Sequence, residues 1–370
     1  MSAGNDLPMN TRKSSNKSAS KQTYEGIQVL RVVAALLVVI THTTFYTHER
    51  LSADMPIWRT GAMGVDIFFI ISGFVMMATA GSLINTAGGW KIFASKRLIR
   101  IAPMYWLATS VKLISMLIIP SMVLHAELSP WTIISSYAFL PSTNIEGRFE
   151  PLLGVGWTLI FEMFFYAVFT VGLFLRVNVI AFTAMVMGTC FIISLFRTPE
   201  WNAATMYFSP IVLYFLIGMI LFKLSKQLRP SAMIAIALIG IAISAIAFAT
   251  LEFDVKSGAA NFATVAVSCL IVLVTIAIEP FVKGRLPAAL LFFGEASYVL
   301  YLFHPLIAPI VPEVLRRTYP AIPPGACVAI CVAVSLIAAA IIHVAIEKPV
   351  TARLRNLKIH NSSSPQAATS

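Results

Sequence analysis

The strongest constraint on the fold of this chain is the apolar stretch from Ile27 to His42, which is long enough, with its flanks, to cross a bilayer. Two ionisable residues, Arg31 and His42, interrupt it. They are eleven residues apart, so on a helix they share one face and lie about 16 Å apart along the axis. Ionisable side chains are costly inside a membrane and usually face the bundle interior or a wet cavity. This face is therefore a functional candidate; the alternatives are that Arg31 snorkels to the headgroups and that His42 hydrogen bonds to a neighbouring helix.

The rest of the chain repeats this apolar pattern. Of its 370 residues, 58% are hydrophobic and only 12% are charged, and the mean hydropathy is +0.84, whereas about a quarter of the residues are charged in an average soluble domain. Apolar runs of about twenty residues predict membrane-spanning helices. We therefore predict an all-α, polytopic integral membrane protein of about ten transmembrane helices, near residues 27–46, 64–80, 101–120, 157–175, 178–196, 207–222, 231–250, 259–279, 288–311 and 323–346.

The distribution of basic residues predicts the orientation of these helices. With a cytoplasmic N-terminus, 19 of the 27 Lys and Arg residues fall on the inner side and seven on the outer side, as the positive-inside rule requires. Both termini are therefore expected in the cytoplasm. The formal charge of +11 fits this orientation signal and does not call for a nucleic-acid partner. We expect a disordered cytoplasmic tail over 1–23, a transmembrane domain over 24–350, and a cytoplasmic tail over 351–370, disordered from 356, with no soluble catalytic domain appended.

Two acidic residues in later spans, Asp66 and Glu162, are possible partners for His42. Asp66 opens the second span, where we expect it at the depth of His42. Glu162 lies on a polar stripe that recurs every four residues down its span. His304 ends a similar stripe in the ninth span, where it could bind the acceptor. A carboxylate beside a histidine fixes its tautomer and stabilises the imidazolium, as a general base requires. The alternatives are a helix-capping role for Asp66 and structural hydrogen bonds for Glu162 and His304.

A second group of charges lies at the inner end of the third span, which we expect to begin after an inner loop. Arg97 and Arg100 are three residues apart and therefore share a helix face. Paired guanidinium groups suit a phosphate-rich ligand such as a nucleotide-linked coenzyme. The alternative is a cluster that only orients the protein, followed by interfacial aromatic residues at Tyr105 and Trp106.

Small residues in the spans are interpreted as packing elements. Gly64 and Gly73 are expected to allow close helix packing. The four cysteines all fall inside predicted spans and are interpreted as buried apolar fillers. We expect no metal site.

In several ordered blocks between about residues 25 and 350, the chain resembles the membrane-bound acyltransferase 3 family. The matching blocks are Leu30-Arg31 with Ala34-Ala35-Leu36 and His42; Gly64-Val65-Asp66-Ile67-Phe68-Phe69 with Ile71-Ser72-Gly73-Phe74; Arg97-Leu98-Ile99-Arg100-Ile101 with Pro103, Tyr105 and Trp106; Gly156-Trp157-Thr158-Leu159 with Glu162 and Tyr166; Ser297-Tyr298; Leu302-Phe303-His304-Pro305; and Glu347-Lys348-Pro349. The block around Trp157 and Glu162 is most similar to members that acetylate bacterial exopolysaccharides.

The resemblance implies an acyl-CoA-dependent O-acyltransferase, most simply an O-acetyltransferase, in the bacterial inner membrane. Acetyl-CoA, as co-substrate, would dock from the cytoplasm, and a hydroxyl of a polysaccharide or lipid-linked sugar would accept the acyl group at the outer side. Direct transfer and an acyl-enzyme step both remain open. The implied site residues are His42, Glu162 and Asp66 for catalysis; Arg97, Arg100 and Arg31 for the coenzyme; and Trp157, Tyr298 and His304 for the acceptor.

Two other classes of protein share these features. In a transporter or flippase, Arg31, His42, Glu162 and His304 would line a path for protons or a sugar-lipid. In a structural or sensory membrane protein, the same residues would only hold helices together. The clustering of paired arginines on the inner side, and of histidine and carboxylate residues on the outer side, favours the enzyme.

Overall fold

The computed structural model describes residues 24–84, 86–118, 128–144, 147–198, 201–250 and 262–362. The predicted N-terminal tail lies outside these residues. Within them the chain is helical apart from loops and one isolated β-bridge between Thr143 and Phe149, so the all-α prediction is confirmed for this part of the chain. The α-helices are α1 (Glu25–Arg50), α2 (Gly64–Ala80), α3 (Gly89–Ile118), α4 (Pro130–Tyr137), α5 (Trp157–Phe174), α6 (Val179–Ser194), α7 (Val212–Ser225), α8 (Pro230–Thr250), α9 (Phe262–Val282), α10 (Ala288–Ile307), α11 (Ile310–Thr318), α12 (Pro324–Ile342) and α13 (Lys348–Ser362).

In the part of the chain that the structure describes, eight helical segments are long and apolar enough to cross a membrane. Two shorter apolar helices, Val179–Ser194 and Pro230–Ile246, coincide with two further predicted spans. These segments support an integral membrane protein. The count of ten spans and the side on which the termini lie stay predictions. The eight segments are Glu25–Arg50, Thr60–Ala80, Gly89–Ile118, Gly154–Phe174, Ala203–Ser225, Thr264–Val282, Ala288–Ile307 and Pro324–Asn356.

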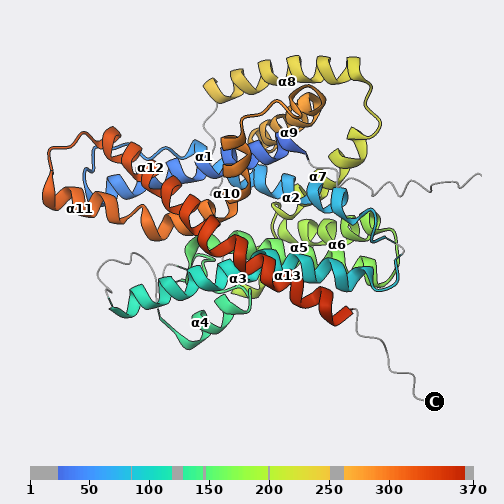
Figure 1. The fold of residues 1–370 in the computed structure, drawn as a ribbon, viewed down its shortest axis with the longest axis horizontal. Helices are drawn as coiled ribbons and strands as arrows, with labels where there is room; N and C mark the ends of the chain where they lie inside the picture. Colours follow the sequence, from blue (N-terminus) through green and yellow to red (C-terminus); the bar gives the residue numbers. More distant parts are fainter. Residues whose placement is uncertain are drawn as a thin grey trace, which may run out of the picture.

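Two helical segments extend more than ten residues beyond their predicted bounds. α3 begins at Gly89, twelve residues before the predicted span, so the basic residues Arg97 and Arg100 lie within a continuous helix and not at its junction with a loop. At the other end of the chain, a π-helical turn over His343–Glu347 joins α12 to α13. Residues 356–362, expected to be disordered, therefore belong to a helix, which packs against α3 (Figure 1).

The closest helix packing joins α2 to α7, where the backbones touch through glycines. A Cβ atom added at Gly73 would lie 2.0 Å from the carbonyl oxygen of Phe215, and one added at Gly218 would lie 2.0 Å from that of Ile70. Similarly, a Cβ at Gly64 would lie 2.3 Å from the carbonyl oxygen of Ala34 on α1. The prediction that Gly64 and Gly73 allow close packing is confirmed.

Because of this contact, we expect that adding a single methyl group at Gly218 lowers the stability of the protein substantially. In Gly218→Ala, α2 and α7 must separate, because the new atom meets backbone and not a flexible side chain; we expect a loss of about 1–3 kcal/mol of stability, as for overpacked cores. Gly188→Ala on α6 is the matched control, since a Cβ there meets nothing within 4 Å. Thermal unfolding of both variants in detergent, followed by size-exclusion chromatography, should show a lower midpoint for Gly218→Ala alone. Equal midpoints would contradict the packing described here.

The connection between α1 and α2 folds back along α1 before the second helix begins. The backbone N–H of Trp58 donates to Thr44 Oγ1 at 3.1 Å, and a Cβ at Gly61 would lie 2.3 Å from the carbonyl oxygen of Leu37. Irregular backbone is tolerated at membrane depth where protein buries it. As a result, α2 begins beside the middle of α1, and not beside its outer end.

The four cysteines carry free thiols. Cys190, Cys327 and Cys331 are buried in hydrophobic clusters. Their interpretation as apolar fillers is therefore confirmed.

Candidate active site

His42, near the outer end of the polar face of α1, contacts His304 of α10. His42 Nδ1 and His304 Nε2 are 3.3 Å apart, and the ring centroids are 5.0 Å apart. His304 is only 1% exposed, whereas His42 is half-buried. The Tyr46 ring, one turn further along α1, stacks against His42 at 6.2 Å. The structure thus brings two of the predicted site residues, His42 and His304, together.

Backbone carbonyls fix the tautomers of both histidines. His42 Nδ1 lies 2.9 Å from the carbonyl oxygen of Val38, and His304 Nδ1 lies 3.1 Å from that of Leu300. Because a carbonyl only accepts, each Nδ1 carries a proton. His304 Nε2 therefore accepts from His42 Nδ1, and the lone pair of His42 lies on Nε2. This arrangement suits a general base, since the neighbouring acceptors stabilise the imidazolium that forms when Nε2 takes up a proton.

Glu162 of α5 belongs to a different group of polar residues. Its Oε1 accepts hydrogen bonds from Ser72 Oγ of α2, at 3.1 Å, and from the Tyr166 hydroxyl one turn further along α5. It also interacts electrostatically with Arg31 and Arg97. The carboxylate therefore lies among the guanidinium groups.

The depth of Glu162 relative to the histidines follows from a neighbouring contact. Thr158 Oγ1 of α5 lies 2.9 Å from the Tyr301 hydroxyl of α10. From Thr158, four residues along α5 lead towards the predicted inner side to Glu162, and from Tyr301 three residues along α10 lead towards the predicted outer side to His304. At 1.5 Å per residue, Glu162 lies about 10 Å inward of the histidine pair.

The three predicted coenzyme-binding arginines converge at this inner level. Arg31 of α1 interacts electrostatically with Arg100, and Arg97 does so with Arg100 as well. The Arg97 guanidinium lies over the rings of Phe93 and Tyr166, 5.4 and 5.8 Å from their centroids, and donates to Thr79 Oγ1. Like charges repel unless counter-charges or a bound anion offset them. The three arginines outnumber the carboxylates of Glu162 and Glu347 that act on Arg31, so they form a site that favours an anion.

Comparison with known proteins matches most of the chain to one family. A family described as "Acyltransferase domain", acyltransferase 3, matches residues 24–344. The chain belongs to the acyltransferase 3 family. The exopolysaccharide production protein ExoZ of Rhizobium meliloti (strain 1021) is 34% identical over 272 residues, which cover 68% of this chain and 78% of ExoZ. No solved structure matches. The resemblance noted from the sequence is therefore confirmed.

In this acyltransferase, Asp66 lies away from His42. Because Gly64 abuts Ala34, Asp66 lies at about the level of Ala34, which is about 12 Å inward of His42 at the helical rise. Its carboxylate is 1% exposed and has no hydrogen-bond partner among the described residues, and it interacts electrostatically with Tyr214 of α7 and Cys269 of α9. The expectation that Asp66 sits at the depth of His42 is wrong, because the preceding loop carries the start of α2 inward.

The other two predicted acceptor residues of the acyltransferase lie in packed surroundings. Trp157, the first residue of α5, packs edge-on against Phe69 and Phe161. Tyr298 is buried, and its hydroxyl donates to the carbonyl oxygen of Ile101 at 2.8 Å. Neither contact reaches the histidine pair, and the acceptor-binding roles of Trp157 and Tyr298 stay predictions.

Sequence reasoning missed three neighbours of the acyltransferase site. Tyr46 follows His42 by one helical turn, and this spacing was a usable signal. Ser72 is the partner of Glu162, which no spacing reveals, since the two are on different helices. The third is Glu150, which interacts electrostatically with Tyr46 and with Lys112, a lysine inside the third predicted span.

Proposed function

We propose that this acyltransferase moves an acetyl group from cytoplasmic acetyl-CoA to a hydroxyl of a cell-surface or exported polysaccharide, in a bacterial inner membrane. The observation that carries the proposal is the separation of two sites along one face of α1. A guanidinium cluster lies at Arg31, and a histidine pair lies at His42. The likeness to ExoZ, which is named an exopolysaccharide production protein, supports the choice of acceptor.

The guanidinium cluster can bind the acyl donor, acetyl-CoA, through its phosphates. Arg31, Arg97 and Arg100 offer forked donors that match phosphate oxygens, as the phosphates of a CoA thioester require. Arg97 is held by Thr79, Phe93 and Tyr166, so its guanidinium is oriented before a ligand arrives. Because basic residues dominate the predicted inner side, we infer that this cluster lies towards the cytoplasm.

The histidine pair accounts for the transfer step. His42 Nε2 takes the proton of the acceptor hydroxyl while the hydroxyl oxygen attacks the thioester carbonyl. The C–S bond then breaks, and the thiolate of CoA leaves as the thiol with the proton from the His42 imidazolium. Throughout the reaction, the Val38 carbonyl oxygen and His304 Nε2 accept from the Nδ1–H of His42 and so stabilise its imidazolium. The pantetheine arm covers the length of α1 between the two sites, which is about 16 Å at the helical rise.

Acetyl content of the surface polysaccharide tests this proposal. In a strain that lacks the protein, we expect base-labile O-acetyl groups to be absent from the polymer by NMR, and the wild-type chain to restore them. Membranes that contain the wild-type chain should also transfer label from [¹⁴C]acetyl-CoA to the deacetylated polymer. A strain whose polymer changes in amount but never in acetylation would instead indicate a transporter.

A further inference from the structure

A second histidine–carboxylate pair lies at the inner end of α12, apart from the residues used above. His343 and Glu347 bound the π-helical turn that joins α12 to α13, and both are buried, with exposures of 4% and 7%. His343 Nδ1 and Glu347 Oε2 are 2.5 Å apart. Single π-helical turns inside α-helices are rare and occur frequently at functional sites.

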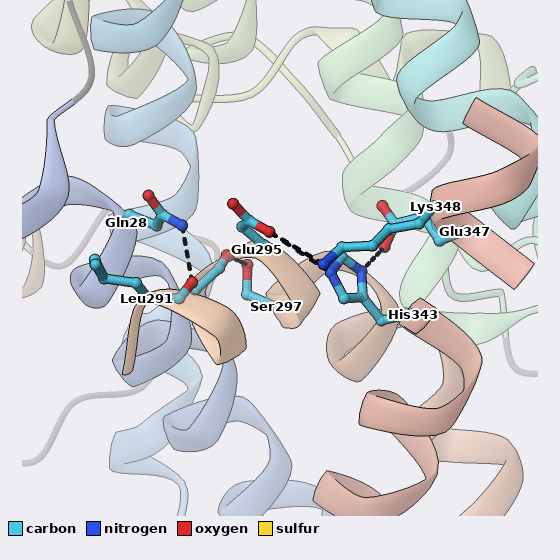
Figure 2. Close-up of polar contacts among 8 residues, drawn as sticks. Gln28, Leu291, Glu295, Ser297, His343, Glu347 and Lys348 are labelled. Carbon is cyan, nitrogen blue, oxygen red and sulfur yellow. Dashed lines mark hydrogen bonds and ion pairs between the residues drawn. The ribbon is translucent and has the colours of Figure 1, made fainter. Parts of the chain in front are cut away.

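The surroundings of this pair are shown in Figure 2. His343 Nε2 has no hydrogen-bond partner among the described residues and lies 3.9 Å from the Glu295 carboxylate of α10. Lys348 Nζ lies 3.6 Å from the same carboxylate. Glu295 and Lys348 are both exposed, whereas His343 and Glu347 are buried. The strongest interaction of His343 is therefore with Glu347.

Glu347 also lies within electrostatic range of the predicted coenzyme-binding cluster, because α1, which carries Arg31, packs against both α10 and α12. It interacts electrostatically with Arg31 of α1 and with Tyr298 of α10. Its short hydrogen bond goes to His343, and its action on Arg31 extends over a longer distance than an ion pair. A buried carboxylate without a donor seeks the nearest cation, because an unpaired buried charge is costly. Arg31 is a cation within its electrostatic range.

We propose that His343 is a positioning residue for the donor site: it holds the Glu347 carboxylate and so keeps it from pairing with Arg31, which leaves the guanidinium available to a phosphate of the acyl-CoA. The inference rests on the proposed function. Without the Nδ1–H donor, Glu347 would turn to Arg31 and compete with the incoming anion. Loss of His343 should therefore weaken the binding of acyl-CoA, and it should change the rate of the transfer step at His42 far less.

The test is CoA binding by the purified full-length protein in lipid nanodiscs, with calorimetry on CoA itself as the probe. Loss of a hydrogen bond to a charged group typically changes an equilibrium about 10- to 100-fold, and we expect His343→Ala to weaken CoA binding by about 10-fold. His343→Asn, which keeps an N–H donor, should bind CoA much as the wild type does. The double variant His343→Ala/Glu347→Gln should recover binding, because a neutral amide no longer competes for Arg31.

The recovery distinguishes positioning from a merely structural role, since a second change in a damaged helix would not restore binding. Ser335→Ala is the matched control: Ser335 is buried on the same helix and bonds only to the backbone of Cys331 among the described residues. If His343→Ala binds CoA like the wild type, or if the double variant binds no better than His343→Ala, the inference is wrong. If the wild type itself binds no CoA and transfers no acetyl group, the proposed function fails instead.

Discussion

Replacing His42 by alanine is expected to abolish O-acetylation of the polymer while the protein stays in the membrane in normal amount. In the proposed mechanism the imidazole is the general base, and such a base contributes about 100- to 10,000-fold to the rate. The change removes a half-buried ring that packs against His304 and Tyr46, and the backbone carbonyl of Val38 remains part of the α1 helix. The effect should therefore fall on turnover and far less on folding.

The measurement is the transfer rate from labelled acetyl-CoA in membranes, normalised to protein by immunoblot. His48→Ala is the matched control, since His48 is a half-buried histidine on the same helix whose ring contacts the carbonyl of Met55 in the outer loop. It should retain transfer. Full restoration of acetylation by His42→Ala would overturn the catalytic assignment.

Replacing Arg100 by alanine is expected to raise the KM for acetyl-CoA with a smaller change in kcat. A charge-assisted hydrogen bond contributes about 1.5–3 kcal/mol, which corresponds to about 10- to 100-fold in affinity. Arg100 is a sharper probe than Arg97, whose guanidinium also contacts Thr79 and two aromatic rings. Lysine at position 100 should recover only part of the loss, because an ammonium keeps the charge but lacks the planar fork.

Initial rates over a range of acetyl-CoA concentrations separate the two parameters. Lys96→Ala provides the control, since Lys96 is an exposed cation of the same helix and its loss tests whether net charge alone matters. An unchanged KM in Arg100→Ala, or an equal rise in Lys96→Ala, would contradict a specific phosphate contact at Arg100.

The class of fold was predictable because apolar length and helical period dominate a membrane chain. The same reasoning found Arg31 and His42 on one face of α1, and it found the close approach at Gly64 and Gly73. The start of α3 and the helix after Glu347 were not predictable. Basic, polar segments favour a loop or a disordered tail by composition, whereas here α13 packs on α3, and this contact supports the helical conformation of both.

The sequence was enough to predict which residues belong to the candidate site, but not which of them contact one another. Periodicity shows which side chains share a face of one helix, but it does not show which helices face each other. The larger error concerned how far Asp66 and Glu162 lie from the membrane surface, because the prediction placed the start of each helix at that surface. The loop before α2 enters the bundle, and the turn before α5 places Thr158 beside Tyr301, so the starts of both helices lie further in. Asp66 and Glu162 consequently lie inward of His42.

The glycine contacts of α1 have a consequence for how the molecule works. Near its inner end, a Cβ at Gly294 of α10 would lie 2.4 Å from the carbonyl oxygen of Gln28, and near its middle Gly64 abuts Ala34. A helix held backbone to backbone at two heights has little freedom to tilt or slide against its neighbours. Alternating access needs such rocking. In the proposed function, α1 therefore keeps Arg31 and His42 at a fixed separation, and the pantetheine arm of the acyl-CoA, not a movement of the protein, spans the distance between them.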